Sequence, residues 1–179
     1  MMVAATLPGL VAAIPVIETD RLVLRAPALA DLPALTAFFA STQSHTVGGP
    51  QDALGAALRL NATIGHWALH GFGSWHVADR ETGAWLGRTG FIFAPGWAEP
   101  ELGWALAAEA QGKGIAYEAA LAARAYGARH LGLTGPISYI RPHNARSIAL
   151  AERLGARHEN NCDFLGKPCR VYRHPGEAA

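Results

Sequence analysis

The chain has 179 residues, of which 50% are hydrophobic and 16% are charged, a composition that excludes an intrinsically disordered protein. Its formal net charge is +1 and it contains no run of lysines or arginines, so nothing favours nucleic acid as the main partner. A chain of this length is expected to form one domain with a core that needs no metal or disulfide staples.

The N-terminal stretch, residues 1–16, is apolar. It lacks the basic start of a secretory signal, since the first basic residue is Arg21. Two prolines interrupt it, and it is too short to span a bilayer, so no membrane association is expected. We interpret it as a loosely ordered leader, followed by a single domain over residues 17–175.

The two cysteines, Cys162 and Cys169, lie close together near the C-terminus. No other cysteine accompanies them, so they do not form a zinc pattern. A disulfide framework needs an oxidising compartment and usually more cysteines. We therefore expect two reduced thiols in a cytoplasmic protein, with no metal site.

The first half of the domain predicts a strand, two helices and a hairpin. Alternation of polar and apolar residues predicts a strand over Arg21–Arg25. Asp31 is a candidate N-cap for a first helix, and the residues from Asp52 to about Trp67 predict a second. Two β-rich runs on either side of Asp79–Gly83 predict a hairpin.

The second half alternates strands and helices. The segment ELGWALA, which begins at Glu101, and the segment ISYIRP predict strands on either side of a helix that ends near His130. Asn144 is expected to cap a further helix that ends near Leu154. Two short strands close the chain, around Arg157–Asn161 and Cys169–Arg173. The fold class is therefore α/β, a mixed sheet of six or seven strands with about four helices, in which the unit from ELGWALA to ISYIRP is the parallel one.

A Gly-Lys-Gly turn stands directly before the central helix, in the stretch EAQGKGIAYEAALAA. Backbone N–H groups at a helix start are unpaired donors, and the helix dipole adds partial positive charge there. Gly112 and Gly114 would let an anion approach without a Cβ in the way. The stretch matches neither the P-loop nor the dinucleotide fingerprint. It predicts a phosphate or diphosphate site of another kind, with a purely structural turn as the alternative.

Four segments in a fixed order carry a resemblance to a known family. The pattern Gln111-x-x-Gly114-x-Ala116 is similar to the acetyl-CoA signature of the GNAT superfamily of N-acetyltransferases. The segments ETDRLVLRAPALADLPAL, PELGWAL and RPHNARSIALAERLGA resemble the opening, a strand and a helix of the branch that includes RimJ and RimL. The resemblance covers about Ile17 to Arg173, which is nearly the whole chain.

The resemblance implies a splayed sheet in which ELGWALA and ISYIRP part at one end, with the pantetheine arm of acetyl-CoA in the gap. The backbone near Leu106 would bind this arm, and Asn144 would contact it, cap its helix, or both. Lys113 is expected to be exposed and to steer the cosubstrate electrostatically. The diphosphate would be held by the backbone amides of Gln111, Gly112, Lys113, Gly114, Ile115 and Ala116.

Acetyl transfer to an amine needs a group that takes the amine's proton and benefits from an acid near the leaving thiolate. Glu101 is the candidate for the first role, directly, through water or by binding the cationic amine, and a solvated charge at a strand end is the alternative. The resemblance implies that Ser147 is the acid, with a hydroxyl bonded to the backbone as the alternative. Many GNAT enzymes carry a tyrosine seven residues after Asn144, but here that position is Ala151.

Other residues could contribute to the acceptor side. A histidine could replace Glu101 as the base, or water could, although an isolated histidine is usually structural. Trp97 could line the acceptor pocket. The candidate histidines are His45, His66, His70 and His76, and none has metal-ligand spacing.

The predicted function is an acetyl-CoA-dependent N-acetyltransferase that acts by direct attack of a primary amine, on a protein N-terminus or on a small molecule. A non-catalytic acyl-CoA sensor and a phosphate-binding domain unrelated to CoA are the alternatives. A basic protein N-terminus would need an acidic approach, for which Glu99, Glu101 and Glu159 are the obvious contributors. A homodimer is possible, and the sequence does not determine the oligomeric state.

Overall fold

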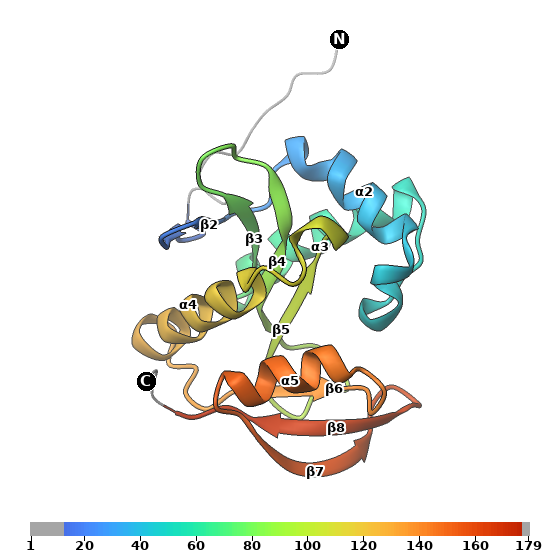
Figure 1. The fold of residues 1–179 in the computed structure, drawn as a ribbon, viewed down its shortest axis with the longest axis vertical. Coiled ribbons are helices and arrows are strands. Elements are labelled where there is room, and N and C mark those ends of the chain that lie inside the picture. The colour runs from blue at the N-terminus through green and yellow to red at the C-terminus, as the bar shows by residue number, and fades with distance from the viewer. Residues whose placement is uncertain (1–12, 177–179) are drawn as a thin grey trace.

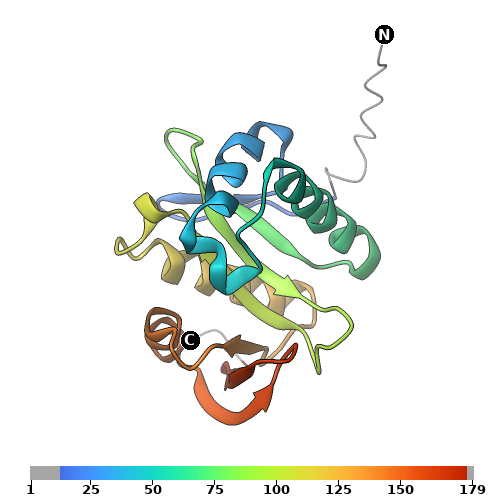
Figure 2. The ribbon, with the colours of Figure 1, turned by 90° about the vertical axis from the view of Figure 1, so that its right-hand side faces the viewer.

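The computed structural model describes residues 13–176, which form one mixed sheet with helices packed against it (Figures 1 and 2). The strand order is β1-β2-β3-β4-β5-β6-β8-β7. Neighbouring strands are antiparallel except β5 and β6, which are parallel, as the sequence predicts. The strands are β1 (Ile17–Glu18), β2 (Leu22–Arg25), β3 (Ser74–Asp79), β4 (Trp85–Ile92), β5 (Glu101–Leu106), β6 (Ile137–Ile140), β7 (Arg157–Asp163) and β8 (Pro168–Arg173).

Four α-helices and three 3₁₀ helices accompany the sheet in the described part of the chain. In Figure 1, β6, β8, β7 and α5 form the lower part of the molecule, and β2 to β5 with α2 and α3 form the upper part. The helices are η1 (Leu29–Asp31), α2 (Leu32–Ala40), η2 (Thr42–Val47), α3 (Ala53–His70), η3 (Ala108–Ala110), α4 (Ile115–His130) and α5 (Ala145–Arg153).

The start of the described chain adds one short strand to the six or seven expected. Strand β1 pairs with β2, at Ile17 with Leu24. Just before it, Ile14 is buried, and the Trp75 indole donates a hydrogen bond to the Pro15 carbonyl at 2.7 Å. The last residues of the apolar leader are thus part of the core. Residues 1–12 lie outside the described residues, so the predicted loose order of the leader stays a prediction.

The Asp31 side chain does not cap α2, although Asp31 precedes the helix as expected. Its carboxylate instead accepts two hydrogen bonds from Arg25, at 2.7 and 2.8 Å, and one from His76 Nδ1 at 2.7 Å. Burial alone would raise the pKa of Asp31, but these bonds hold it well below its usual range. Burial also lowers the pKa of His76. The network joins β2, β3 and the start of α2, and this tertiary role overrides the capping preference.

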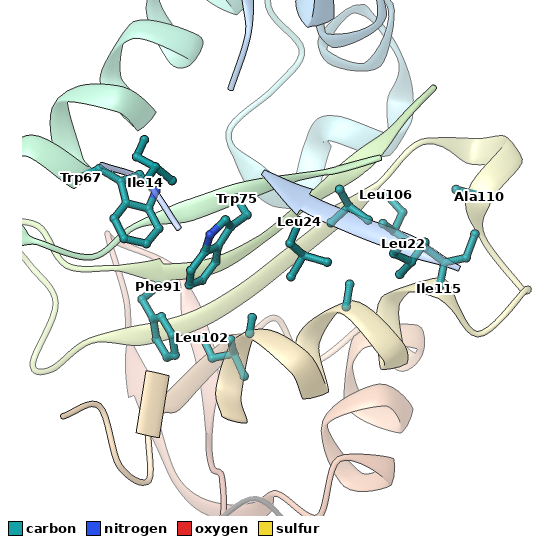
Figure 3. Close-up of a cluster of buried hydrophobic side chains, with 13 residues drawn as sticks. Ile14, Leu22, Leu24, Trp67, Trp75, Phe91, Leu102, Leu106, Ala110 and Ile115 are labelled. Carbon is teal, nitrogen blue, oxygen red and sulfur yellow. The ribbon is translucent and has the colours of Figure 1, made fainter. Parts of the chain in front are cut away.

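The main hydrophobic core lies between the sheet and α4 (Figure 3). Trp75, Phe91 and Leu102 point from three neighbouring strands toward the helix, which meets them with small residues such as Ala119 and Ala123. A second cluster packs α2 and α3 against other residues of the sheet, including Trp85. In β5, Leu102 and Leu106 belong to the first cluster and Ala105 to the second, so the two clusters lie on opposite faces of the sheet.

Close packing of α4 on β4 predicts a stability effect at Gly127. A Cβ added to Gly127 would lie 2.3 Å from the ring of Phe91, which is fully buried. We expect Gly127→Ala to destabilise the protein by about 1–3 kcal/mol, the usual effect of overpacking a core. Gly65→Ala, in α3 where nothing lies within 4 Å, should instead stabilise it by about 0.5–1 kcal/mol. Urea denaturation of the two variants measures whether stability falls in Gly127→Ala and rises in Gly65→Ala. An unchanged urea midpoint for Gly127→Ala would contradict the predicted clash with Phe91.

Candidate active site

The sheet splays between β5 and β6, which pair at a single register position, at Glu101. Just beyond this position the Ser138 hydroxyl donates to the Leu102 carbonyl at 2.6 Å, so this carbonyl points toward β6. Carbonyls of alternate residues in a strand point to the same side. The backbone groups of Trp104 and Leu106 therefore also face the gap, where no strand of the described chain pairs with them. The Gln111 side chain donates to the Leu106 carbonyl at 3.1 Å. The other main-chain groups in this position need polar partners, which a linear amide-bearing ligand can supply.

A cavity of about 450 Å³ opens where the strands part. Glu101 lines it at the start of β5, and Trp97 lines it from the preceding loop. Asn144 and Ser147 line it from the start of α5. The structure thus brings the two candidate catalytic residues, far apart in the sequence, to one cavity. Further lining comes from η2, α3, β4, β6 and the loop between β7 and β8.

Glu101 is the acidic residue of this cavity. Its carboxylate accepts hydrogen bonds from Trp97 Nε1 at 2.8 Å and from the Tyr139 backbone amide at 3.3 Å. Burial raises the pKa of Glu101 to about 7, although these two bonds and the nearby Arg88 and Arg141 act to lower it. A carboxyl group that titrates near neutral pH is suited to take up a proton. The alternative of a freely solvated strand-end charge is wrong, because the side chain is half-buried and its carboxylate accepts these two hydrogen bonds.

Ser147 sits on the first turn of α5. Its hydroxyl accepts a hydrogen bond from Trp104 Nε1 at 3.3 Å, and no bond joins it to the carbonyl one turn back, so that alternative is wrong. The Ser147 amide donates to Asn144 Oδ1 at 3.1 Å, which confirms Asn144 as the N-cap of α5. The capping bond leaves the Asn144 amide nitrogen free to meet a ligand in the cavity. Ala151 is fully buried in the core, where a tyrosine would have no room.

The Gly-Lys-Gly turn connects η3 to α4. Gly112 and Gly114 have φ of 74° and 77°, in the left-handed region that glycine adopts without strain. No backbone amide from Gly112 to Tyr117 makes a well-aligned hydrogen bond to a carbonyl outside α4 in the described chain, and the Glu118 amide donates to the Gly114 carbonyl at 3.1 Å. A run of free amides at the start of a 16-residue helix suits a diphosphate. This turn therefore fits the predicted cosubstrate.

Gln111 and Lys113 differ in how they take part in the turn. The Gln111 side chain donates to Gln43 Oε1 at 2.8 Å and to the Leu106 carbonyl at 3.1 Å, and it accepts from Arg146 at 2.6 Å. It thus ties η2, β5 and α5 to the turn. Lys113 is exposed, as predicted, and only its carbonyl is held, by Arg21 at 3.0 Å. The expected role of its ammonium group, electrostatic steering of the cosubstrate, stays a prediction.

Of the four candidate histidines, His45 alone lines the cavity. His66 Nδ1 donates to the Phe72 carbonyl at 2.8 Å, and its Nε2 accepts from the Phe93 amide at 3.0 Å, which makes it a structural residue. His76 is committed to Asp31. His70 is exposed and packs beside His66.

Sequence reasoning missed several residues that line the cavity. Arg88 stands in the middle of β4, among small and apolar neighbours, and this unusual position for a charge was the available signal. Arg59 and Arg141 gave no such signal, because helices and strand ends often carry exposed charges. Tyr139 also lines the cavity, stacked on Phe164 with ring centroids 4.0 Å apart.

Two further features of residues 13–176 bear on ligand classes. No helix there is long and apolar enough to cross a membrane. No group of three or more His, Cys, Asp or Glu side chains is arranged there as a metal site. Cys162 and Cys169 are free and lie opposite each other on β7 and β8.

Comparisons with known proteins agree with this geometry. The family model described as an acetyltransferase (GNAT) domain matches residues 21–157. An acetyltransferase from Agrobacterium tumefaciens str. C58 is 36% identical, with a TM-score of 0.82 over 90% of this chain and 94% of that one. The uncharacterized protein YkkB of Bacillus subtilis (strain 168) is 32% identical over 107 residues, which are 58% of this chain and 61% of that protein. This chain thus aligns with less than two thirds of YkkB.

A RimL ribosomal-protein α-N-acetyltransferase in complex with coenzyme A also has this fold. It is 18% identical, with a TM-score of 0.76 over 92% of this chain and 100% of that one, and at this identity the likeness shows the fold alone. Because the family model covers well over half of its residues, the chain belongs to the GNAT acetyltransferase family.

Proposed function

We propose that this protein transfers an acetyl group from acetyl-CoA to a primary amine by direct attack. The observation that carries the proposal is the Glu101 carboxyl group, which opens onto the same cavity as the splay between β5 and β6 and the start of α5. A binding surface for CoA alone would not need an enclosed carboxylate that titrates near neutral pH. This feature favours an enzyme over a non-catalytic acyl-CoA sensor.

Each part of the site has a defined task in this proposal. The free amides from Gly112 to Tyr117 hold the diphosphate, and the open edge of β5 near Trp104 and Leu106 holds the amide-bearing arm. The bound thioester supplies an activated acetyl group. Glu101 takes the proton of the attacking amine. In the balanced reaction an ammonium group and a thioester become an amide, a thiol and one proton, with a new C–N bond in place of the C–S bond.

Thiol release measured with acetyl-CoA across a panel of amines and N-terminal peptides tests the proposal. At least one acceptor should release thiol well above the rate without protein, and mass spectrometry should find that acceptor heavier by one acetyl group. Binding of CoA without turnover of any acceptor would favour the sensor instead. Coenzyme A should also raise the melting temperature, because a ligand of the native state stabilises it.

Ser147 gives a prediction about the leaving group. Its hydroxyl lines the cavity and is oriented by Trp104 Nε1. If it protonates the departing sulfur, Ser147→Ala should lower kcat by about tenfold to hundredfold and leave the acceptor KM nearly unchanged. Ser41→Ala is a matched control outside the cavity, where the hydroxyl bonds the Phe38 carbonyl at 2.7 Å. An unaltered kcat for Ser147→Ala in steady-state assays would leave water as the acid.

A further inference from the structure

The acceptor side of the cavity is lined by three arginines that have no carboxylate partner. They are Arg59 from α3, Arg88 from β4 and Arg141 at the end of β6. None of them forms an ion pair within residues 13–176. Arg141 donates to the carbonyls of the β7–β8 loop, at 2.9 Å for Lys167. Glu101 is the one carboxylate lining the cavity, so the cavity carries excess positive charge.

The register of β4 and β5 places Arg88 and Glu101 on one face of the sheet. Ile92 pairs with Glu101, and Arg88 lies four residues before Ile92, so its side chain projects to the same face. Four strand residues separate the two Cα positions by about 13 Å. Both side chains line the cavity, and their Cα positions mark two ends of this span. A short molecule with a cationic and an anionic end fits between them.

The environment of Arg88 is unfavourable for an isolated cation. Burial, together with the nearby Arg59, lowers the pKa of Arg88 to about 10, against the opposing effect of Glu101. No hydrogen bond joins the Arg88 or Arg59 side chain to any residue of the described chain, and Arg59 lies over the Phe39 ring, 5.9 Å from its centroid. Both arginines are half-buried in the wall of the cavity. Guanidinium groups in such a position are commonly paired, and their planar fork matches a carboxylate. The missing partner is therefore an anion that arrives from outside.

That anion belongs to the acceptor and not to the cosubstrate. The free amides for the diphosphate lie at the start of α4, whereas Arg59 and Arg88 lie on the face of the sheet covered by α2 and α3. A basic protein N-terminus is disfavoured by the same charges. The acidic approach that it would need is also missing, because Glu99 and Glu159 are both ion-paired with Arg173.

We propose that the acceptor is a small amine that carries a carboxylate, with Arg88 and Arg59 binding the carboxylate while the amine faces Glu101. This inference rests on the proposed N-acetyltransferase function and names the substrate class of that site. The amine and the carboxylate of such a molecule have opposite charges, and the two ends of the cavity match them. The product is the corresponding N-acetylated amino acid and free thiol, with the amine's proton passed to Glu101.

The test compares matched acceptors in the thiol-release assay. Glycine, β-alanine and 4-aminobutyrate are each paired with the corresponding amide, which keeps the amine but lacks the negative charge. Aminomethylphosphonate and peptides with an acidic N-terminal residue are added to the panel. We expect at least one amino acid to exceed its amide in kcat/KM by roughly tenfold to hundredfold, the range for a hydrogen bond to a charged group. Arg88→Gln and Arg59→Gln should each raise KM for that amino acid. Each should also remove most of the difference in kcat/KM between the amino acid and its amide.

Controls separate this inference from the proposed function. Arg80→Gln removes the same charge from an exposed residue that pairs with Glu18, and it should leave the preference intact. The inference would be wrong if neutral amines were acetylated as fast as the amino acids and if Arg88→Gln and Arg59→Gln did not change these rates. The proposed N-acetyltransferase function would still hold in that case. A preference for acidic peptides or for the aminophosphonate would also overturn the inference as stated. Turnover of no acceptor of any kind would instead count against the proposed function.

Discussion

Glu101→Gln is expected to lower kcat/KM by about 10²–10⁴-fold, the range for loss of a positioned general base. The glutamine keeps the size of the side chain and can still accept a hydrogen bond from Trp97, but it cannot take a proton from the amine. Glu99→Gln is the matched control, because Glu99 lies two residues earlier and is ion-paired with Arg173. Steady-state thiol release with the best acceptor measures both variants. Equal rates for Glu101→Gln and the parent protein would remove Glu101 from the mechanism.

The pH dependence of the parent enzyme provides a second readout of the same group. Burial raises the pKa of Glu101 to about 7, so the carboxylate form needed to accept a proton is lost below this pH. We therefore expect kcat/KM to rise as the pH increases through about 7. In Glu101→Gln this step should be absent from the residual activity. A profile with the same step in both proteins would assign the ionisation to another group, such as the acceptor amine.

Stability should respond to Glu101 in the opposite direction. The pKa of Glu101 is raised from 4.5 to about 7 in the folded protein, so between these values the folded state binds more protons than the unfolded state. Stability is then lost as the pH rises through this window, because ionising the enclosed carboxyl group is unfavourable. Glu101→Gln lacks this loss, so its free energy of unfolding relative to the parent should be greater at pH 8 than at pH 5. Urea denaturation at the two pH values measures the difference and also shows whether the inactive variant is folded.

Local patterns were sufficient to predict most of the elements of this fold. The hairpin around Asp79–Gly83, the capping of α5 by Asn144 and the parallel pair formed by β5 and β6 all depend on residues close in sequence or on a general rule of chain connection. Asp31 shows the limit of such reasoning. Its residue type favours a helix cap, but Arg25 and a histidine 45 residues away bind its carboxylate more effectively.

The acceptor side of the cavity could not be predicted in the same way. Arg88 faces the same cavity as Glu101 because β4 and β5 pair in one particular register, and a slip of one residue would turn Arg88 to the other face. Arg59 reaches the cavity from a helix, beside the loop that follows η2, and no local pattern indicates η2. Charge complementarity with a ligand is thus a property of the assembled sheet, whereas Glu101 was identified because it begins a strand with a family-like pattern.

The turn before α4 carries the other large expected effect, on binding of the cosubstrate. Gly114 has φ of 77°, which a β-branched residue adopts only with strain of about 1–3 kcal/mol. Space is not the obstacle, because a Cβ there would lie 3.6 Å from Arg21, an ordinary contact. To relieve the strain, Gly114→Val must rotate the backbone and turn its amides away from a common point. We therefore expect it to weaken CoA binding by roughly tenfold to hundredfold.

Lys113→Ala is the informative comparison for this turn. The lysine is exposed and its side chain bonds to nothing in the described chain, so its removal should raise the Kd for CoA by less than about threefold at physiological salt. Calorimetric titration with CoA measures both variants, and the melting temperature without ligand shows whether Gly114→Val disturbs the helix itself. If the lysine variant lost affinity and the valine variant kept it, the side-chain charge and not the main chain would bind the diphosphate. We expect the opposite result, in which Gly114→Val loses affinity for CoA and Lys113→Ala keeps it. That result would assign recognition of the diphosphate to the backbone amides.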